Sequence, residues 1–99
     1  MLYAIIWEDV EDSLALRKAA RPMHLERMNE LIAAGRLIIG GPFPAIDAED
    51  PGPAGFTGSV IIAEFASLAD AEQWINDDPY AKSGIFRKLT VKPFVQVVP

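Results

Sequence analysis

Residues 2–7 of the chain read LYAIIW, a run in which every position carries an apolar side chain. Successive side chains of a β-strand point to opposite faces of the sheet, so a strand with this sequence is apolar on both faces. Residues 60–65, VIIAEF, are nearly the same, with Glu64 as the exception. Both segments are rich in branched and aromatic residues, which predicts two strands at the centre of one sheet.

The other elements are predicted from periodicity, caps and breakers. A helical pattern runs over residues 13–34, where Pro22 either kinks one helix or begins a second one. Gly35 then ends the helix. Four further segments complete the chain: a strand at 36–41, a capped helix at 67–77, one helical turn at 78–84 and an edge-type strand at 89–99.

The order strand, helix, strand, strand, helix, strand predicts a ferredoxin-like α+β fold in a single domain spanning residues 1–99. Right-handed crossovers place the first and third strands at the centre of a four-stranded antiparallel sheet. Two helices of this length cover only one face of such a sheet. We therefore expect a second copy of the chain to cover the other face, which gives a homodimer or a higher homo-oligomer.

Composition narrows the function classes. The chain has 99 residues, a formal net charge of -5 and no cysteine. Because binding to a phosphate backbone needs clustered Lys and Arg, nucleic acid is not an expected partner. No apolar run approaches the roughly 20 residues of a membrane span, and the N-terminal residues lack the basic flank of a signal peptide. These features predict a soluble cytoplasmic protein that contacts no membrane.

His24 is the only histidine of the chain. At about 100° per residue it falls between Met28 and Leu31 on the inward face of the first helix. Arg21, one turn earlier on the same side of the helix, is the nearest charged residue that precedes it in sequence. A core histidine whose ring nitrogens are satisfied by backbone or buried water explains this position as well as a functional one does.

A second segment changes that balance. Asp78 precedes Pro79 and is predicted to cap the turn that follows, whereas Asp77 reads as a solvated loop charge. The segment lies at the end of the sheet where the first helix starts, so a carboxylate in this segment can reach His24. A carboxylate that holds one ring nitrogen leaves the other as an oriented base, and such an imidazole suits proton transfer.

The stretch from residue 40 to 58 holds nine Gly or Pro residues, which indicates either a functional loop over a pocket or a disordered connection. It lacks the Lys and the helix start of a phosphate-binding loop and the spacing of a calcium loop. With one His and no Cys, a zinc site would need three carboxylates. We therefore expect no metal and no cofactor.

The sequence resembles the YciI-like, or YCII-related, family over essentially its whole length. The segments that carry the resemblance are RPMHLERMNELIAAGRL, GGPFPAID, DPGPAGFTGSVIIAEF, DPYAKSGIF and VKPF, in that order. The resemblance implies a ferredoxin-like fold of the dimeric α/β-barrel group, with a site built on a His and Asp pair that matches His24 and Asp78. A serine of the family pattern falls at Ser59. One group of relatives removes chloride from a chlorinated hydroxyhydroquinone without a metal.

Two main functions follow as hypotheses. The first is a cofactor-free lyase, dehydrochlorinase or isomerase acting on a small aromatic or enolic molecule, with His24 as general acid or base and Asp78 orienting it. Ser59 or Arg21 would bind an anionic oxygen of the substrate, and Gly41, Pro42 and Tyr80 are further candidate substrate contacts. The alternative is a non-catalytic domain that binds a small metabolite or regulates through it. A third possibility is a purely structural dimerisation domain.

Overall fold

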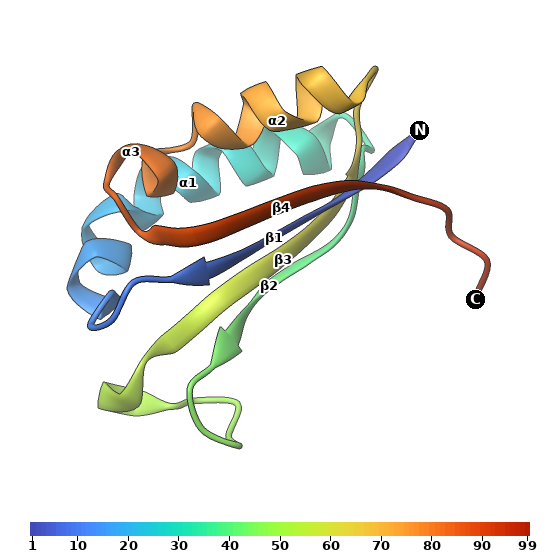
Figure 1. The fold of residues 1–99 in the computed structure, drawn as a ribbon. Coiled ribbons are helices and arrows are strands. Elements are labelled where there is room, and N and C mark those ends of the chain that lie inside the picture. Colours follow the sequence, from blue (N-terminus) through green and yellow to red (C-terminus); the bar gives the residue numbers. More distant parts are fainter.

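The computed structural model describes residues 1–99, and its elements follow the predicted order (Figure 1). Three α-helices lie on one side of a single sheet, and a short 3-10 turn, Gly52–Ala54, lies in the loop between two strands. The elements along the chain are β1 (Leu2–Asp9), α1 (Leu14–Ala33), β2 (Leu37–Pro44), β3 (Phe56–Glu64), α2 (Leu68–Asn76), α3 (Pro79–Lys82) and β4 (Phe86–Phe94). None of the helices has the length and apolar character needed to cross a membrane.

The sheet is antiparallel throughout, with the strand order β2-β3-β1-β4. The two strands with apolar residues on both faces, β1 and β3, are therefore central, which confirms the ferredoxin-like prediction. Trp7 of β1 pairs with Ser59 of β3 on one side and with Leu89 of β4 on the other. Gly58 allows β1 and β3 to approach at this point, because a Cβ atom there would collide with the Trp7 carbonyl oxygen.

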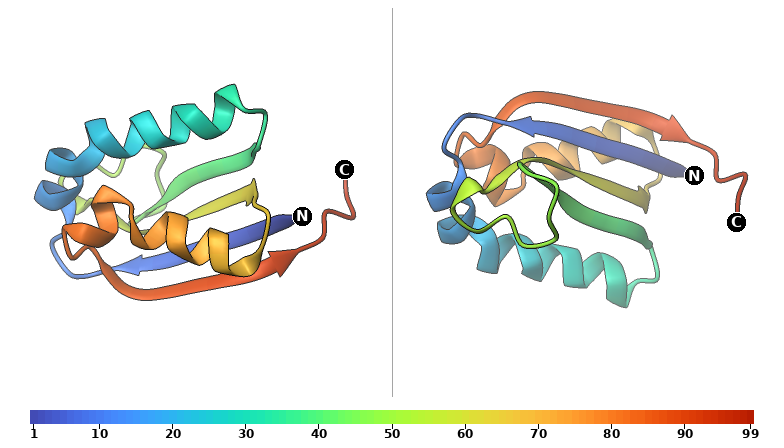
Figure 2. Two further views of the ribbon diagram at one scale, coloured as in Figure 1. Left: turned by 90° about the horizontal axis from the view of Figure 1, so that it is seen from above. Right: turned by 90° about the horizontal axis from the view of Figure 1, so that it is seen from below.

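The helices cover one face of the sheet (Figure 2), and the hydrophobic core lies between the helices and that face. Alternate side chains of β1, Tyr3, Ile5 and Trp7, point into it, and Leu31 of α1 and Ile75 of α2 close it from the helix side. The opposite face of the sheet carries no helix. There the intervening side chain of β1, Ile6, is 39% exposed and Ile39 of β2 is 59% exposed.

Helix α1 is continuous through Pro22. Of the two predicted alternatives, one helix that contains Pro22 therefore forms, and a second helix does not begin there. Ser13 occupies its N-cap position, but its side chain makes no capping hydrogen bond. The Ser13 hydroxyl instead donates to the Asp9 carboxylate at 2.6 Å. The start of α1 is thus tied to the end of β1 by a side-chain contact.

Two predicted strands have wrong boundaries, and the pairing explains where they end. The last strand begins earlier than residue 89 and ends at Phe94, because its only neighbour is β1 and Phe94 already pairs with Leu2. Residues 95–99 have no strand left to pair with and project from the domain (Figure 1). The second strand extends beyond residue 41 to Pro44, which pairs with Phe56. The loop between β2 and β3 is therefore shorter than the stretch from residue 40 to 58 in which it was predicted.

Candidate active site

The buried contact between His24 and Asp78 joins the middle of α1 to the start of α3. Nδ1 of His24 lies 2.9 Å from Oδ1 and 3.0 Å from Oδ2 of Asp78. The Asp78 side chain is fully buried, and that of His24 is 11% exposed. Because the carboxylate accepts a hydrogen bond from Nδ1–H, the ring is either the neutral tautomer protonated at Nδ1 or the imidazolium. The second ring nitrogen, Nε2, makes no hydrogen bond within the protein.

Asp78 is held by two more donors. It caps α3 as predicted, accepting from the backbone N–H of Tyr80 at 2.9 Å, and it accepts from Nη1 of Arg27 at 2.9 Å. Arg27 in turn lies over the Trp74 ring, with 4.5 Å from its Cζ to the ring centroid. Burial alone would raise the pKa of Asp78, but the hydrogen bonds from His24 and Tyr80 and the charges of His24 and Arg27 outweigh it and lower that pKa. The carboxylate is therefore ionised at neutral pH.

Aromatic rings fix the imidazole plane. The Tyr80 ring is stacked on the His24 ring at 4.1 Å between centroids, and Trp7 meets both rings edge-on. Burial raises the pKa of Tyr80, and the charges of Arg17 and Arg21 only partly oppose it, so the phenol stays protonated at neutral pH. Nε1 of Trp7 is shut off from solvent and has no hydrogen-bond partner.

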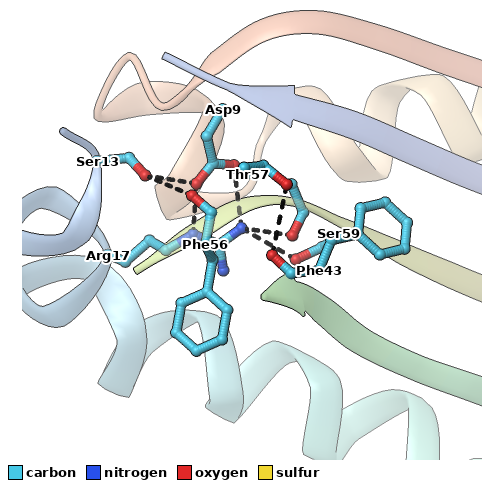
Figure 3. Close-up of polar contacts among 8 residues, drawn as sticks. Asp9, Ser13, Arg17, Phe43, Phe56, Thr57 and Ser59 are labelled. Atoms are coloured by element: carbon cyan, nitrogen blue, oxygen red, sulfur yellow. Dashed lines mark hydrogen bonds and ion pairs between the residues drawn. The ribbon is translucent and has the colours of Figure 1, made fainter. Parts of the chain in front are cut away.

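A second buried polar cluster lies next to this pair, towards the start of α1 (Figure 3). Arg17 donates from Nε and Nη2 to the two oxygens of Asp9, at 2.6 and 3.0 Å. Its Nη2 also donates to the Gly58 carbonyl at 2.9 Å and to the Ser59 hydroxyl at 3.1 Å. The guanidinium carbon lies 5.4 Å from the centroids of both the Phe56 and Tyr80 rings. Tyr80 therefore contacts both clusters.

The predicted site residues separate into three groups. His24, Asp78 and Tyr80 come together, and Ser59 lies in the neighbouring cluster on Arg17. Arg21 is exposed and makes no side-chain hydrogen bond or ion pair, although its charge acts on Tyr80. Gly41 and Pro42 lie on the exposed edge strand β2. By the alternation of the strand, Gly41 belongs to the face away from the helices, because it pairs with Val60.

Sequence reasoning missed Arg17, Asp9 and Arg27. One signal for Arg17 was available, since it lies seven residues before His24 and so on the same side of the helix. Arg27 follows His24 by three residues and carried a similar signal, but its partner Asp78 is 51 residues away. Asp9 lies close to its partners Ser13 and Arg17 in sequence, but the end of β1 and the start of α1 have no shared periodicity that would indicate the contact. Nowhere do three or more His, Cys, Asp and Glu side chains gather in a way that could hold a metal ion.

The fold and these contacts define a class of small ferredoxin-like domain in which a buried His and Asp pair joins two helices, α1 and α3, at one end of the sheet. Residues 1–95 match the YCII-related domain family, and the chain belongs to that family.

A relative in the same family and a solved structure are both similar to nearly the whole chain. Protein YciI of Escherichia coli O6:H1 is 50% identical over 97 residues, which cover 98% of this chain and 99% of that protein. Among solved structures, 5-chloro-2-hydroxyhydroquinone dehydrochlorinase (TftG) from Burkholderia phenoliruptrix, in complex with 2,5-dihydroxybenzoquinone, aligns with a TM-score of 0.84 and 27% identity. The alignment covers 96% of this chain and 94% of the dehydrochlorinase.

Proposed function

We propose that this protein is a cofactor-free enzyme in which His24 transfers a proton to or from a small aromatic or enolic molecule. The observation that carries the proposal is the buried His24–Asp78 contact, which occupies Nδ1 and leaves Nε2 without a protein partner. An ionised carboxylate behind an imidazole fixes its tautomer and stabilises the imidazolium that forms when Nε2 accepts a proton. Asp78 is the positioning residue in this scheme.

The chemistry needs no other reagent. Nε2 takes a proton from an acidic C–H or O–H of the substrate, and the electron pair left behind moves onto a conjugated carbonyl oxygen or expels an anionic leaving group such as chloride. The imidazolium then returns the proton to the product or to water. Isomerisation and elimination differ only in where the electron pair goes, so the same pair serves both.

The substrate class rests on the similarity to the dehydrochlorinase. That protein acts on a chlorinated hydroxyhydroquinone and holds a dihydroxybenzoquinone, both of which are small oxygenated six-membered rings. With 27% identity over 96% of this chain, the similarity supports substrates of the same general kind without identifying one.

The first experiment measures chloride release from 5-chloro-2-hydroxyhydroquinone under anaerobic conditions. We expect turnover by the unaltered protein and a decrease of about 10²- to 10⁴-fold for His24→Gln. The exposed Gln73→Ala variant on α2 is the control and keeps full activity. Turnover by His24→Gln at the unaltered rate would contradict the role of His24, and a ligand that binds without being changed would favour the metabolite-binding alternative.

The sheet face without helices supports a homodimer as the working form. On that face Ile6, Ile39 and Phe43 are 39%, 59% and 39% exposed, and burial of such side chains provides about 25 cal/mol per Å² of apolar area. We expect light scattering at micromolar concentration to give twice the mass of the 10.8 kDa chain. Ile6→Glu should yield a folded monomer, and a monomeric mass for the unaltered protein would contradict the dimer.

A further inference from the structure

Arg17, Tyr80 and His24 form a row in which each member contacts the next. The Tyr80 ring centroid lies 4.1 Å from the His24 ring centroid and 5.4 Å from Cζ of Arg17. The imidazole and the guanidinium are therefore at most about 9.5 Å apart. Arg17 and His24 lie two turns apart on the same side of α1, and α3 inserts Tyr80 between them.

Each member of this row keeps one polar atom that no protein group satisfies. These atoms are Nη1 of Arg17, the Tyr80 hydroxyl and Nε2 of His24, and none of them takes part in a hydrogen bond of the structure. Trp7 Nε1 is the one unpaired side-chain atom that is fully shut off from solvent, so the three atoms of the row retain access. Nη2 of Arg17 makes the contacts to Asp9, Gly58 and Ser59. Figure 3 shows that the other terminal nitrogen of Arg17 makes no contact with the residues drawn.

The guanidinium is held rigidly in this position. Asp9 binds it through two oxygens, Gly58 and Ser59 bind Nη2, and only 7% of the Arg17 side chain is exposed. A donor fixed in this way loses little conformational entropy when it binds a ligand. The charges of Arg17 and Arg27 balance those of Asp9 and Asp78, so the two buried clusters do not repel an anion.

We infer that Arg17 binds, through Nη1, the anionic oxygen of a planar enolate, phenolate or hydroxyquinone whose reacting end meets Nε2 of His24. This inference rests on the proposed function and adds the charge of the ligand and the residue that recognises it. The Tyr80 ring lies between the imidazole and the guanidinium, and its protonated hydroxyl is a further donor to an oxygen of the ligand. The oxyanion role that the sequence suggested for Arg21 passes to Arg17, because the exposed Arg21 has no partner that would fix its side chain.

The test compares two ligands of the same ring. 2,5-Dihydroxybenzoquinone is a vinylogous acid and anionic at neutral pH, and its 2,5-dimethoxy ether is neutral. We expect calorimetry on the unaltered dimer to show that the anion binds about 10- to 100-fold more tightly than the ether. Equal affinity of the two ligands, or no binding of the anion, would overturn the inference without any variant having to fold.

The second measurement assigns this preference to Arg17. Arg17→Lys keeps the positive charge beside Asp9 but removes Nη1, so we expect the anion-to-ether ratio to fall about tenfold or more towards unity. Arg87→Lys is the matched control, because Arg87 is exposed and pairs only with Glu8. A purely structural role of Arg17 would weaken both ligands equally and leave the ratio unchanged, and that result would overturn the assignment.

His24→Gln separates this inference from the proposed function. In that variant Arg17 is intact, so the anion preference should persist while chloride release is lost. If His24→Gln keeps both the preference and full turnover, the proton-transfer role fails and the Arg17 assignment stands. If the unaltered protein turns over substrate but shows no anion preference, the Arg17 assignment fails alone.

Discussion

Two aspartates are buried in this domain, and they are stabilised in different ways. Asp9, at the end of β1, is bound by Nε and Nη2 of Arg17 and by the Ser13 hydroxyl. Asp78, at the start of α3, divides its two oxygens among Arg27, a backbone N–H and an imidazole. Both carboxylates sit among donors, but only Asp78 has an imidazole partner, a group that can both accept and donate a proton.

This difference separates a structural cluster from a candidate catalytic one. Asp9 joins β1 to α1, and its partner Arg17 extends the cluster to β3. The partners of Asp9 are a guanidinium and a hydroxyl, and neither is a typical proton-transfer group. The contacts of Asp78 leave the far side of the imidazole unpaired, so a proton can arrive there while the carboxylate balances the charge. The first cluster fixes the position of Arg17, and the second provides the group that can react.

The largest predicted effect on stability belongs to Asp9. Asp9→Asn leaves the Arg17 guanidinium buried without its counter-ion, and loss of one partner of a buried pair costs about 3–5 kcal/mol. Asp78→Asn should cost less, about 1–3 kcal/mol, because its charged partner Arg27 is already 22% exposed and is not left fully buried. Urea unfolding at pH 7 measures both free energies.

Asp47→Asn in the exposed loop provides the control for these two variants and should change the free energy of unfolding by less than about 0.5 kcal/mol. Equal losses for Asp9→Asn and Asp78→Asn would show that the two carboxylates are not distinguished by their partners. The comparison on which the site assignment rests would then fail.

The pH dependence of the free energy of unfolding tests the ionised state of Asp78. The pKa of Asp78 is lowered in the folded state from its ordinary value of 3.8, so its ionised form stabilises the fold above that pH. This contribution is lost as the pH falls through the lowered folded-state pKa, where the native carboxylate finally takes up a proton. We expect the stability difference between the unaltered protein and Asp78→Asn to shrink as the pH falls below about 4. A difference that keeps its size or grows below pH 4 would contradict the lowered pKa of Asp78.

The fold was predictable from local pattern because it depends on short-range signals. The apolar faces of 2–7 and 60–65 placed β1 and β3 at the centre, and the Asp78–Pro79 pair marked the start of α3. The end of β4 was not predictable in this way, since a strand ends where its neighbour does and residues 95–99 remain strand-like in composition. The number of residues of β4 that can pair is set by the length of β1 and not by the sequence of β4 itself.

The candidate site was predictable only in part for the same reason. The inward direction of His24 followed from helical periodicity, and the reach of Asp78 followed from the topology. The contacts of Arg17 with Asp9 and Ser59 depend on the register between β1 and β3, which no single segment encodes. Arg21 was the nearer charge in sequence, but the helix turns its side chain outward.

The smallest predicted effect concerns two serines that occupy equivalent positions. Ser13 and Ser67 both stand at helix N-caps, but Ser67 accepts a hydrogen bond from the backbone N–H of Asp70, whereas Ser13 donates to Asp9. Each change to alanine should cost about 1 kcal/mol, for different reasons.

A double-mutant cycle distinguishes the two reasons. The effect of Ser13→Ala should largely disappear when Asp9 is also replaced, whereas Ser67→Ala should add to Asp9→Asn without coupling. Additive behaviour at Ser13 would mean that its hydroxyl supports the start of α1 alone, and the cluster that holds Arg17 would then consist of Asp9, Gly58 and Ser59.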